Sequence, residues 1–205
     1  SSSDIESNWI PQFCSQYGHE IFLEVPQDFI EDDFNLTGLN QMIPHYREAL
    51  YVILDIDSTE NALVTHSAEV LYGLIHARFI ITKQGLHLMA DKFERNVFGS
   101  CPRHLCRGFH LIPIGRVDLL GVETVRLYCA NCNDIYLPNS SKYLNLDGAF
   151  FGSSFAGLFV KLFPEVGRQC QRGEPFDLKL VGFKLNDRAV ACRRMKWLRS
   201  FPDDV

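Results

Sequence analysis

The sequence predicts an α+β protein in which a mostly α-helical N-terminal domain is followed by a four-cysteine zinc ribbon and an extended C-terminal tail. Apolar residues recur three and four positions apart through the first half, as they do in amphipathic helices. After Gly99, short β-prone runs alternate with glycine and proline, and four cysteines lie among them. We place the acidic helical domain at residues 1–99, the ribbon at 100–165 and the tail at 166–205.

The first domain is expected to contain successive helices. Trp9 and Phe13, four positions apart, lie on one face of the first helix. Proline opens two of the later helices, where its missing N–H costs nothing. The expected helix starts are, in order, near Ser7 or Asn8, at Pro26, at Pro44, near Ser67 and after Gly85. His76 has an apolar setting within the fourth of these helices, and we expect it to be a hydrogen-bonded core histidine rather than a ligand.

The second half is expected to consist of short strands. The β-prone runs are HLIPI at 110–114, ETVRLY at 123–128, DIYLP at 134–138 and DLKLVGFKL at 177–185, with one short helix within 153–164. A zinc ribbon has this organisation, because the bound metal replaces a large hydrophobic core.

The four cysteines form the most informative motif, C-x4-C followed after twenty-two residues by C-x2-C. Two close thiolate pairs can complete a tetrahedral Zn²⁺ shell, and a shell closed in this way is structural rather than catalytic. Disulfides are the alternative, but the chain has seven cysteines, an odd number, and the other three are scattered, which favours a reducing compartment. We predict one structural zinc ion per chain, bound by Cys101, Cys106, Cys129 and Cys132.

Charge is divided unevenly along the chain. Residues 1–70 have thirteen acidic and one basic residue, a net charge of −12, whereas residues 71–205 have nineteen basic and twelve acidic residues, a net charge of +7. The acidic half opposes nucleic-acid binding. The basic C-terminal stretch nevertheless motivates an alternative function, a zinc-ribbon protein that binds nucleic acid through Arg193, Arg194, Lys196 and Arg199. Membrane insertion is not expected, because no apolar run approaches the roughly 20 residues of a span.

Signatures of the common enzyme classes are absent. The P-loop, dinucleotide-binding, nucleophile-elbow, zinc-protease and protein-kinase motifs do not occur. A Cys–His nucleophile pair is left open by the sequence, although no free cysteine lies in a recognisable elbow or helix-start context. We therefore predict a protein that is not an enzyme.

Motifs at fixed distances resemble the regulatory beta subunit of casein kinase II. CPRHLC, IPIG and TVRLYCANC, within residues 101–132, follow the ribbon signature of that family. The resemblance continues in the same order through FNLTGLN, PHYREAL, LYGLIHARFI, FGSCPR and DGAFFG, so it covers nearly the whole chain.

The resemblance implies a function for the chain. It implies a non-catalytic regulatory subunit of a Ser/Thr protein kinase that dimerises through its zinc ribbon, either as a homodimer or with another beta subunit. The dimer would bind catalytic alpha subunits and modulate their stability, activity and choice of protein substrates. Such a subunit is expected in the cytoplasm and the nucleus. The alternative is a kinase-independent scaffold, which would result if the chain had lost kinase binding.

The resemblance also places partner-binding residues in the tail, at Leu180, Val181, Gly182 and Phe183. Phe183 falls on an aromatic anchor of the family, and buried aromatics are common hot spots. Packing of Phe183 within its own chain is the alternative. Val181 stands where the family commonly has a tyrosine, so we expect weaker affinity for the kinase.

Other departures from the family pattern indicate a divergent paralogue. His104 stands in the ribbon where an aliphatic residue is expected, and Ala130 replaces a proline between the last two cysteines. The loop after Asp55 is shorter than in the family, and its other acids are Asp57 and Glu60, which puts a polyamine response in doubt.

The N-terminus carries a phosphorylation pattern. Ser1 and Ser3 each precede an acidic residue by three positions, Asp4 and Glu6. Kinases of the casein kinase II type select that spacing, because a basic pocket can pair with the carboxylate. We predict phosphorylation at Ser1 and Ser3.

Overall fold

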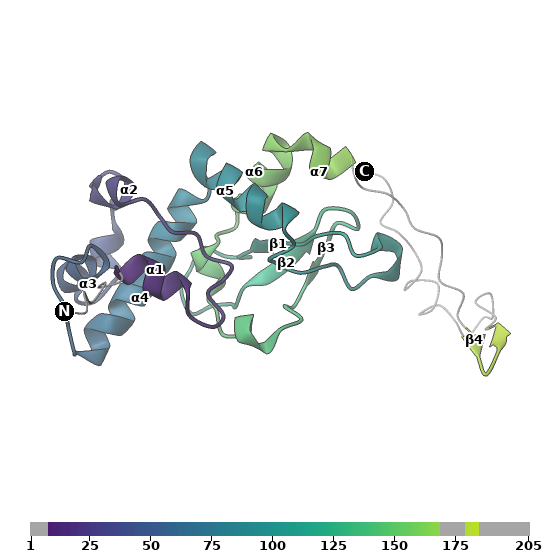
Figure 1. The fold of residues 1–205 in the computed structure, drawn as a ribbon, viewed down its shortest axis with the longest axis horizontal. Helices are drawn as coiled ribbons and strands as arrows, with labels where there is room; N and C mark the ends of the chain where they lie inside the picture. Colours follow the sequence, from purple (N-terminus) through teal and green to yellow (C-terminus); the bar gives the residue numbers. More distant parts are fainter. Residues whose placement is uncertain (1–7, 169–178, 185–205) are drawn as a thin grey trace, which may run out of the picture.

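The structure is a computed structural model and describes residues 8–168 and 179–184 (Figure 1). Ser1, Ser3, most of the predicted tail and the four basic residues near its end lie outside the described residues. The elements are, in order, α1 (Trp9–Cys14), α2 (Gln27–Glu31), η1 (Leu39–Gln41), α3 (Tyr46–Ile53), α4 (Ala62–Phe79), α5 (Lys83–Glu94), η2 (His104–Cys106), β1 (Ile112–Ile114), β2 (Arg126–Cys129), β3 (Asp134–Tyr136), η3 (Ser141–Tyr143), η4 (Gly148–Phe150), α6 (Phe155–Leu162), α7 (Pro164–Arg168), β4 (Lys179–Leu180) and β5 (Phe183–Lys184).

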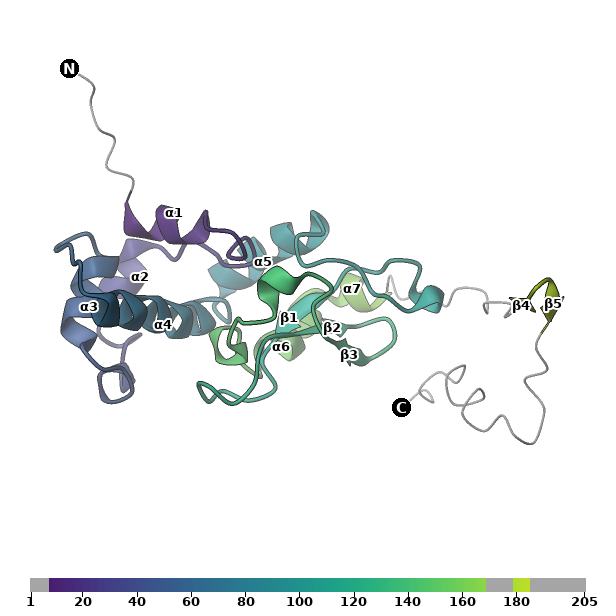
Figure 2. The ribbon, with the colours of Figure 1, turned by 90° about the horizontal axis from the view of Figure 1, so that it is seen from below.

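The predicted class is confirmed: helices occupy the N-terminal half and short strands follow (Figures 1 and 2). Four cysteines lie together among the strands and turns. The central element is α4, which packs along α3. Its first turn is capped by Asn61, whose side-chain oxygen accepts a hydrogen bond from the backbone N–H of Leu63 at 3.0 Å. The apolar side chains of α4 are distributed around most of the helix. It is therefore buried on several sides rather than along one stripe.

The start of α5 differs from the sequence prediction. We expected this helix after Gly85, but it begins at Lys83, and Gly85 lies in its first turn. Thr82 is the cap, since its hydroxyl oxygen accepts a hydrogen bond from the Gly85 N–H at 3.1 Å. A Cβ atom at Gly85 would lie 2.2 Å from the carbonyl oxygen of Phe79, so glycine is required by the close approach of α4 and α5.

The ribbon is a three-stranded antiparallel sheet with strand order β1-β2-β3. Leu127 pairs with Tyr136 and Cys129 pairs with Asp134. Residues directly opposite each other in an antiparallel pair share a face of the sheet, so these four side chains lie on one face. Leu127 and Cys129 are buried on it. This register therefore places the end of β2 and the side chains of β3 on the face that holds the cysteines.

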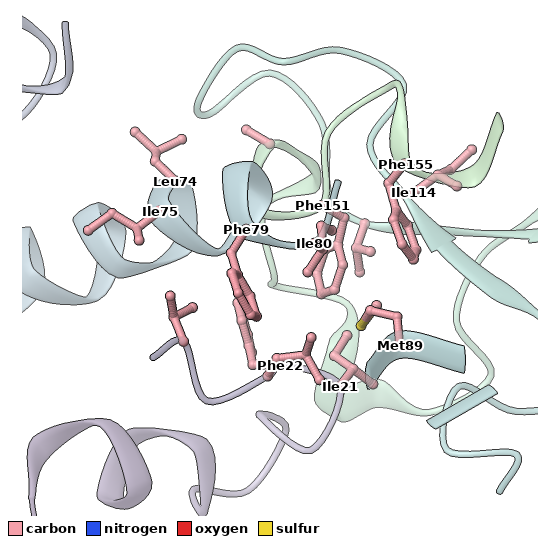
Figure 3. Close-up of a cluster of buried hydrophobic side chains, with 14 of the residues drawn as sticks. Ile21, Phe22, Leu74, Ile75, Phe79, Ile80, Met89, Ile114, Phe151 and Phe155 are labelled. Carbon is pink, nitrogen blue, oxygen red and sulfur yellow. The ribbon is translucent and has the colours of Figure 1, made fainter. Parts of the chain in front are cut away.

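Helical and ribbon residues share one buried cluster. Figure 3 shows Phe22 from the segment before α2, Phe79 from α4, Met89 from α5, Ile114 from β1 and Phe151 after η4 directed toward a common interior. The rings of Phe22 and Phe151 lie 5.5 Å apart between centroids. The two parts of the chain thus stabilise each other by burying apolar surface in common. The predicted domain boundaries stay a prediction.

His76 is a fully buried core histidine, as expected. Its Nδ1 lies 2.8 Å from the carbonyl oxygen of Phe150, so the neutral ring donates a hydrogen bond from α4 to η4. The Nε2 atom of His76 has no hydrogen-bond partner among the described residues. Burial lowers the pKa of His76 to about 4, because a charged imidazole would lose its hydration there.

Candidate metal centre and partner-binding residues

The four predicted cysteine ligands come from two turns that lie next to each other. Cys101 and Cys106 flank the turn that contains η2, and the backbone N–H of Cys101 donates to the carbonyl oxygen of Phe109 at 2.8 Å. Cys129 ends β2, and Cys132 lies in the turn that leads to β3. All four side chains are buried. The structure therefore brings together residues that are separated by up to 31 positions.

The spacing of the sulfur atoms fits a tetrahedral metal site. All four Sγ atoms lie within 4.8 Å of one another, and the Cys101–Cys132 and Cys106–Cys129 pairs are each 3.9 Å apart. Sulfurs at the corners of a tetrahedron around Zn²⁺, with metal–sulfur bonds of about 2.3 Å, would be about 3.8 Å apart. The residues present can thus hold a metal ion, and they would fill a four-coordinate shell completely.

Contacts among the four sulfurs shift the pKa values of two of the cysteines in opposite directions. Hydrogen bonds from Cys129 and Cys132 lower the pKa of Cys101. The hydrogen bond with Cys101 is the largest cause that raises the pKa of Cys129, and the hydrogen bond with Cys132 is the next. These contacts favour the thiolate form of Cys101 and the thiol form of Cys129. A divalent cation would displace the remaining protons, so metal binding is expected to be pH-dependent.

Residues outside the cysteine motif also surround the cluster. The hydroxyl oxygen of Tyr136, on β3, lies 3.1 Å from Sγ of Cys132. Arg103 pairs with Asp134 at 3.4 Å and so joins the first cysteine turn to β3. Sequence reasoning missed both contacts. The only sequence signal for these contacts is closeness to the ligands, since Arg103 lies two residues after Cys101 and Tyr136 lies four residues after Cys132. The contacts themselves depend on strand register.

The predicted partner-binding residues form a β-hairpin. Leu180 and Phe183 are opposite each other in the β4–β5 pair, and Val181 and Gly182 make the turn between them. Both turn residues have positive φ, 49° and 84°, as in the tight turns that match strand twist. The side chain of Phe183 is 78% exposed and that of Leu180 is 65% exposed. Among the described residues, Phe183 does not join the buried core, and its role in partner binding stays a prediction.

The residues that depart from the family pattern lie on the surface or in turns. His104 is exposed in η2, and Ala130 lies half-buried in the turn between the last two cysteines. The short acidic loop is exposed, but Asp55 has a structural contact: its carboxylate accepts a hydrogen bond from the Trp9 N–H at 2.9 Å, at the start of α1. Fewer acids of this loop are thus available to an external cation than their number suggests.

The fold and the cluster together define a mixed helix-and-sheet protein with a buried four-thiolate site suited to a metal ion. Its sequence identifies the group more closely. The family model described as Casein kinase II regulatory subunit matches residues 8–184, and the chain belongs to this family. The match includes both the cysteine cluster and the β4–β5 hairpin. The family fits a non-catalytic role.

Curated relatives support this assignment. The chain is 52% identical to casein kinase II subunit beta of Candida albicans, in an alignment that covers 95% of this chain and 80% of the relative. It is 45% identical to the subunit beta of Saccharomyces cerevisiae, over 98% of this chain and 88% of the relative. It is also 45% identical to casein kinase II subunit beta' of Drosophila melanogaster, over 90% and 86%.

No helix within residues 8–168 is both long and apolar enough to span a membrane.

Proposed function

We propose that this chain is a non-catalytic regulatory subunit of a casein kinase II-type Ser/Thr protein kinase and carries one structural zinc ion. Family membership supports the regulatory role. The donor set of four buried thiolates favours Zn²⁺ over hard cations such as Mg²⁺ and Ca²⁺, which prefer oxygen ligands. Bound zinc would hold the two cysteine turns together, and the closed shell leaves no position for a reacting water.

Dimerisation through the ribbon is the second part of the proposal, as a homodimer or with another beta subunit. It is supported by apolar side chains that the ribbon leaves in water: Ile135 on β3 is 44% exposed and Leu137 just after it is 59% exposed. A second copy of the ribbon would cover such residues. Sedimentation of the zinc-loaded chain is expected to give twice the chain mass, and a zinc-loaded monomer would contradict this part.

Binding of the catalytic alpha subunit is the third part, and the exposed Leu180–Phe183 pair is the observation that carries it. A two-stranded hairpin gains little stability by itself. The exposure to water of an aromatic and an aliphatic side chain paired across its strands is therefore unfavourable unless a partner covers them. A pocket on a partner would bury both. The bound subunit would shift the stability and activity of the kinase through binding free energy, and would recruit protein substrates.

Titration of the chain against the catalytic subunit tests this part. Phe183→Ala is expected to weaken binding by about 2 kcal/mol or more, as truncation of a hot-spot aromatic does. Phe34→Ala is the matched control, because Phe34 is also a phenylalanine in water, 83% exposed, but lies after α2. Equal affinities for wild type and Phe183→Ala would contradict a hot spot at Phe183. Absence of binding by the wild type would leave the kinase-independent scaffold as the better description.

A cytoplasmic and nuclear location belongs to the same proposal. Its support is chemical: the cysteines of the described residues are free, and a thiolate metal site is preserved in a reducing compartment. Microscopy of the tagged full chain would check the location directly.

A further inference from the structure

A tyrosine hydroxyl points into the cysteine cluster, toward the sulfurs of Cys132 and Cys101. Oη of Tyr136 lies 3.1 Å from Sγ of Cys132, and the tyrosine is partly buried. A thiolate bound to a metal has no proton, so in the loaded site only the phenol can donate. The contact is then an O–H···S hydrogen bond to a metal ligand.

Strand register fixes this tyrosine on the metal face. Tyr136 is opposite Leu127, and Asp134 is opposite Cys129, whereas Tyr128 is opposite Ile135. Since opposite residues share a face and neighbours alternate, Tyr136 lies on the face of Cys129, and Tyr128 lies on the other. A shift of one residue in the β2–β3 pairing would carry the Tyr136 hydroxyl away from the cluster.

The site has a chemical need for such a donor. Four thiolates around one divalent cation give a net charge of −2, in a buried place where hydrogen bonds to the sulfurs are the available compensation. The backbone N–H groups of Arg103 and Cys132 supply hydrogen bonds to Cys101 and Cys129. Any residue type can supply a backbone donor. The hydroxyl of Tyr136 is supplied by a side chain, so one oxygen atom can be removed to test it.

We infer that Tyr136 is a positioning residue of the metal centre: its hydroxyl holds the Cys132 sulfur as a thiolate ligand and slows the loss of the metal. Partners just outside a metal's ligands orient those ligands and tune their basicity. The hydrogen bond fixes the direction of the Cys132 side chain and offsets part of the negative charge on its sulfur. The inference rests on the proposed occupation of the cluster by zinc.

The competing explanation is that Tyr136 only packs its ring against the core, which it also contacts. Tyr136→Phe separates the two roles, since it keeps the ring and removes the hydroxyl. Tyr128→Phe is the matched control. It removes a hydroxyl from the same β2–β3 pair, but that hydroxyl donates to the Asn133 side chain at 3.0 Å on the opposite face.

The test is transfer of zinc from the loaded full-length chain to a coloured chelator. Tyr136→Phe is expected to lower zinc affinity by roughly tenfold or more, with faster release, as loss of such a partner does elsewhere. Tyr128→Phe is expected to behave as wild type. Equal release from wild type and Tyr136→Phe overturns the inference, and so does an equal acceleration in both variants.

A spectroscopic measurement excludes a purely structural effect. In the Co²⁺-loaded chain, loss of the hydrogen bond makes the Cys132 sulfur a stronger electron donor, so Tyr136→Phe is expected to move the sulfur-to-cobalt charge-transfer bands to lower energy. Unmoved bands would contradict the inference even if release were faster. Wild-type chain that binds neither zinc nor cobalt would instead refute the zinc site itself, so the two failures are distinguishable.

Discussion

The ammonium group of Lys142 lies 3.0 Å from a carboxylate oxygen of Glu20, 122 positions away in the sequence. Lys142 belongs to η3 of the ribbon half, and Glu20 lies between α1 and α2 of the helical half. The same ammonium lies 4.7 Å from the ring centroid of Tyr143, and Lys92 donates to the backbone oxygen of Glu20 at 2.7 Å. This cluster therefore ties the two halves together through charge as well as through the apolar core.

Removing the Lys142 charge is expected to weaken that tie modestly. Lys142→Met keeps the aliphatic part of the side chain, and we expect it to lower the free energy of unfolding by about 0.5–1 kcal/mol, because the ion pair is partly exposed. Urea unfolding at low and high salt measures this, and the loss should shrink with salt. Lys161→Met, at an exposed position of α6, is the control. A double variant that combines Lys142→Met with Glu20→Gln measures the coupling. A loss in the double variant equal to the sum of the two single losses would show that the residues are not coupled.

Stability is expected to fall in mild acid because of His76. Its pKa is about 6.5 when unfolded and about 4 when buried. The folded protein thus binds the proton less tightly, so the stabilising effect is fully present above pH 6.5 and is lost as the pH falls toward 4. Linkage makes this loss roughly 3 kcal/mol. Urea unfolding of the wild type between pH 7 and pH 4 measures the slope.

His76→Gln is the control for this pH dependence, because glutamine retains a donor for the Phe150 carbonyl but does not titrate. Acid also releases metal from thiolates, but that contribution is common to both proteins. The difference between wild type and His76→Gln should therefore change by the His76 contribution alone. Parallel curves for the two proteins would show that His76 does not have the depressed pKa.

Sequence reasoning succeeded where the signal is local. Trp9 and Phe13 are four positions apart, and their rings stack at 5.0 Å between centroids in α1. The four cysteines were predictable for the same reason, because each pair lies within one turn and only the meeting of the two turns is non-local. The core role of His76 followed from its apolar neighbours along one helix.

Contacts that depend on tertiary arrangement were not predictable. The Lys142–Glu20 pair and the Cys132–Tyr136 contact require, respectively, the packing of the two halves and the β2–β3 register, and neither leaves a periodic trace in the sequence. The start of α5 was misplaced for a related reason. Glycine was interpreted as a helix boundary, whereas Gly85 is needed inside the helix because the end of α4 approaches it closely.

Val181 offers a gain-of-function prediction. It is a β-branched residue at φ 49°, a region that strains such residues, and its side chain is 89% exposed. Val181→Tyr relieves part of the strain and adds a ring next to Phe183, so we expect binding to the catalytic subunit to tighten by about 1 kcal/mol or more. Calorimetric titration measures the change.

Val181→Asn separates the two causes of that gain, because asparagine tolerates positive φ but adds no ring. An equal improvement in Val181→Asn and Val181→Tyr would assign the gain to a better-formed hairpin. No improvement in either variant would contradict the expectation that Val181 limits affinity.

Loss of one cysteine ligand is expected to abolish the metal site and, with it, the ribbon. Cys129 is fully buried, and its replacement by serine leaves three thiolates for a shell that needs four. Zinc content should fall from about one per chain to near zero, and the dimer should dissociate, because the short strands have little core of their own. Metal analysis and sedimentation measure both.

Cys14→Ser is the matched control, since burial raises the pKa of Cys14 to about 11 and its sulfur faces the Leu23 carbonyl, away from the cluster. Zinc retained in Cys129→Ser, or lost equally in Cys14→Ser, would contradict a site made by these four residues.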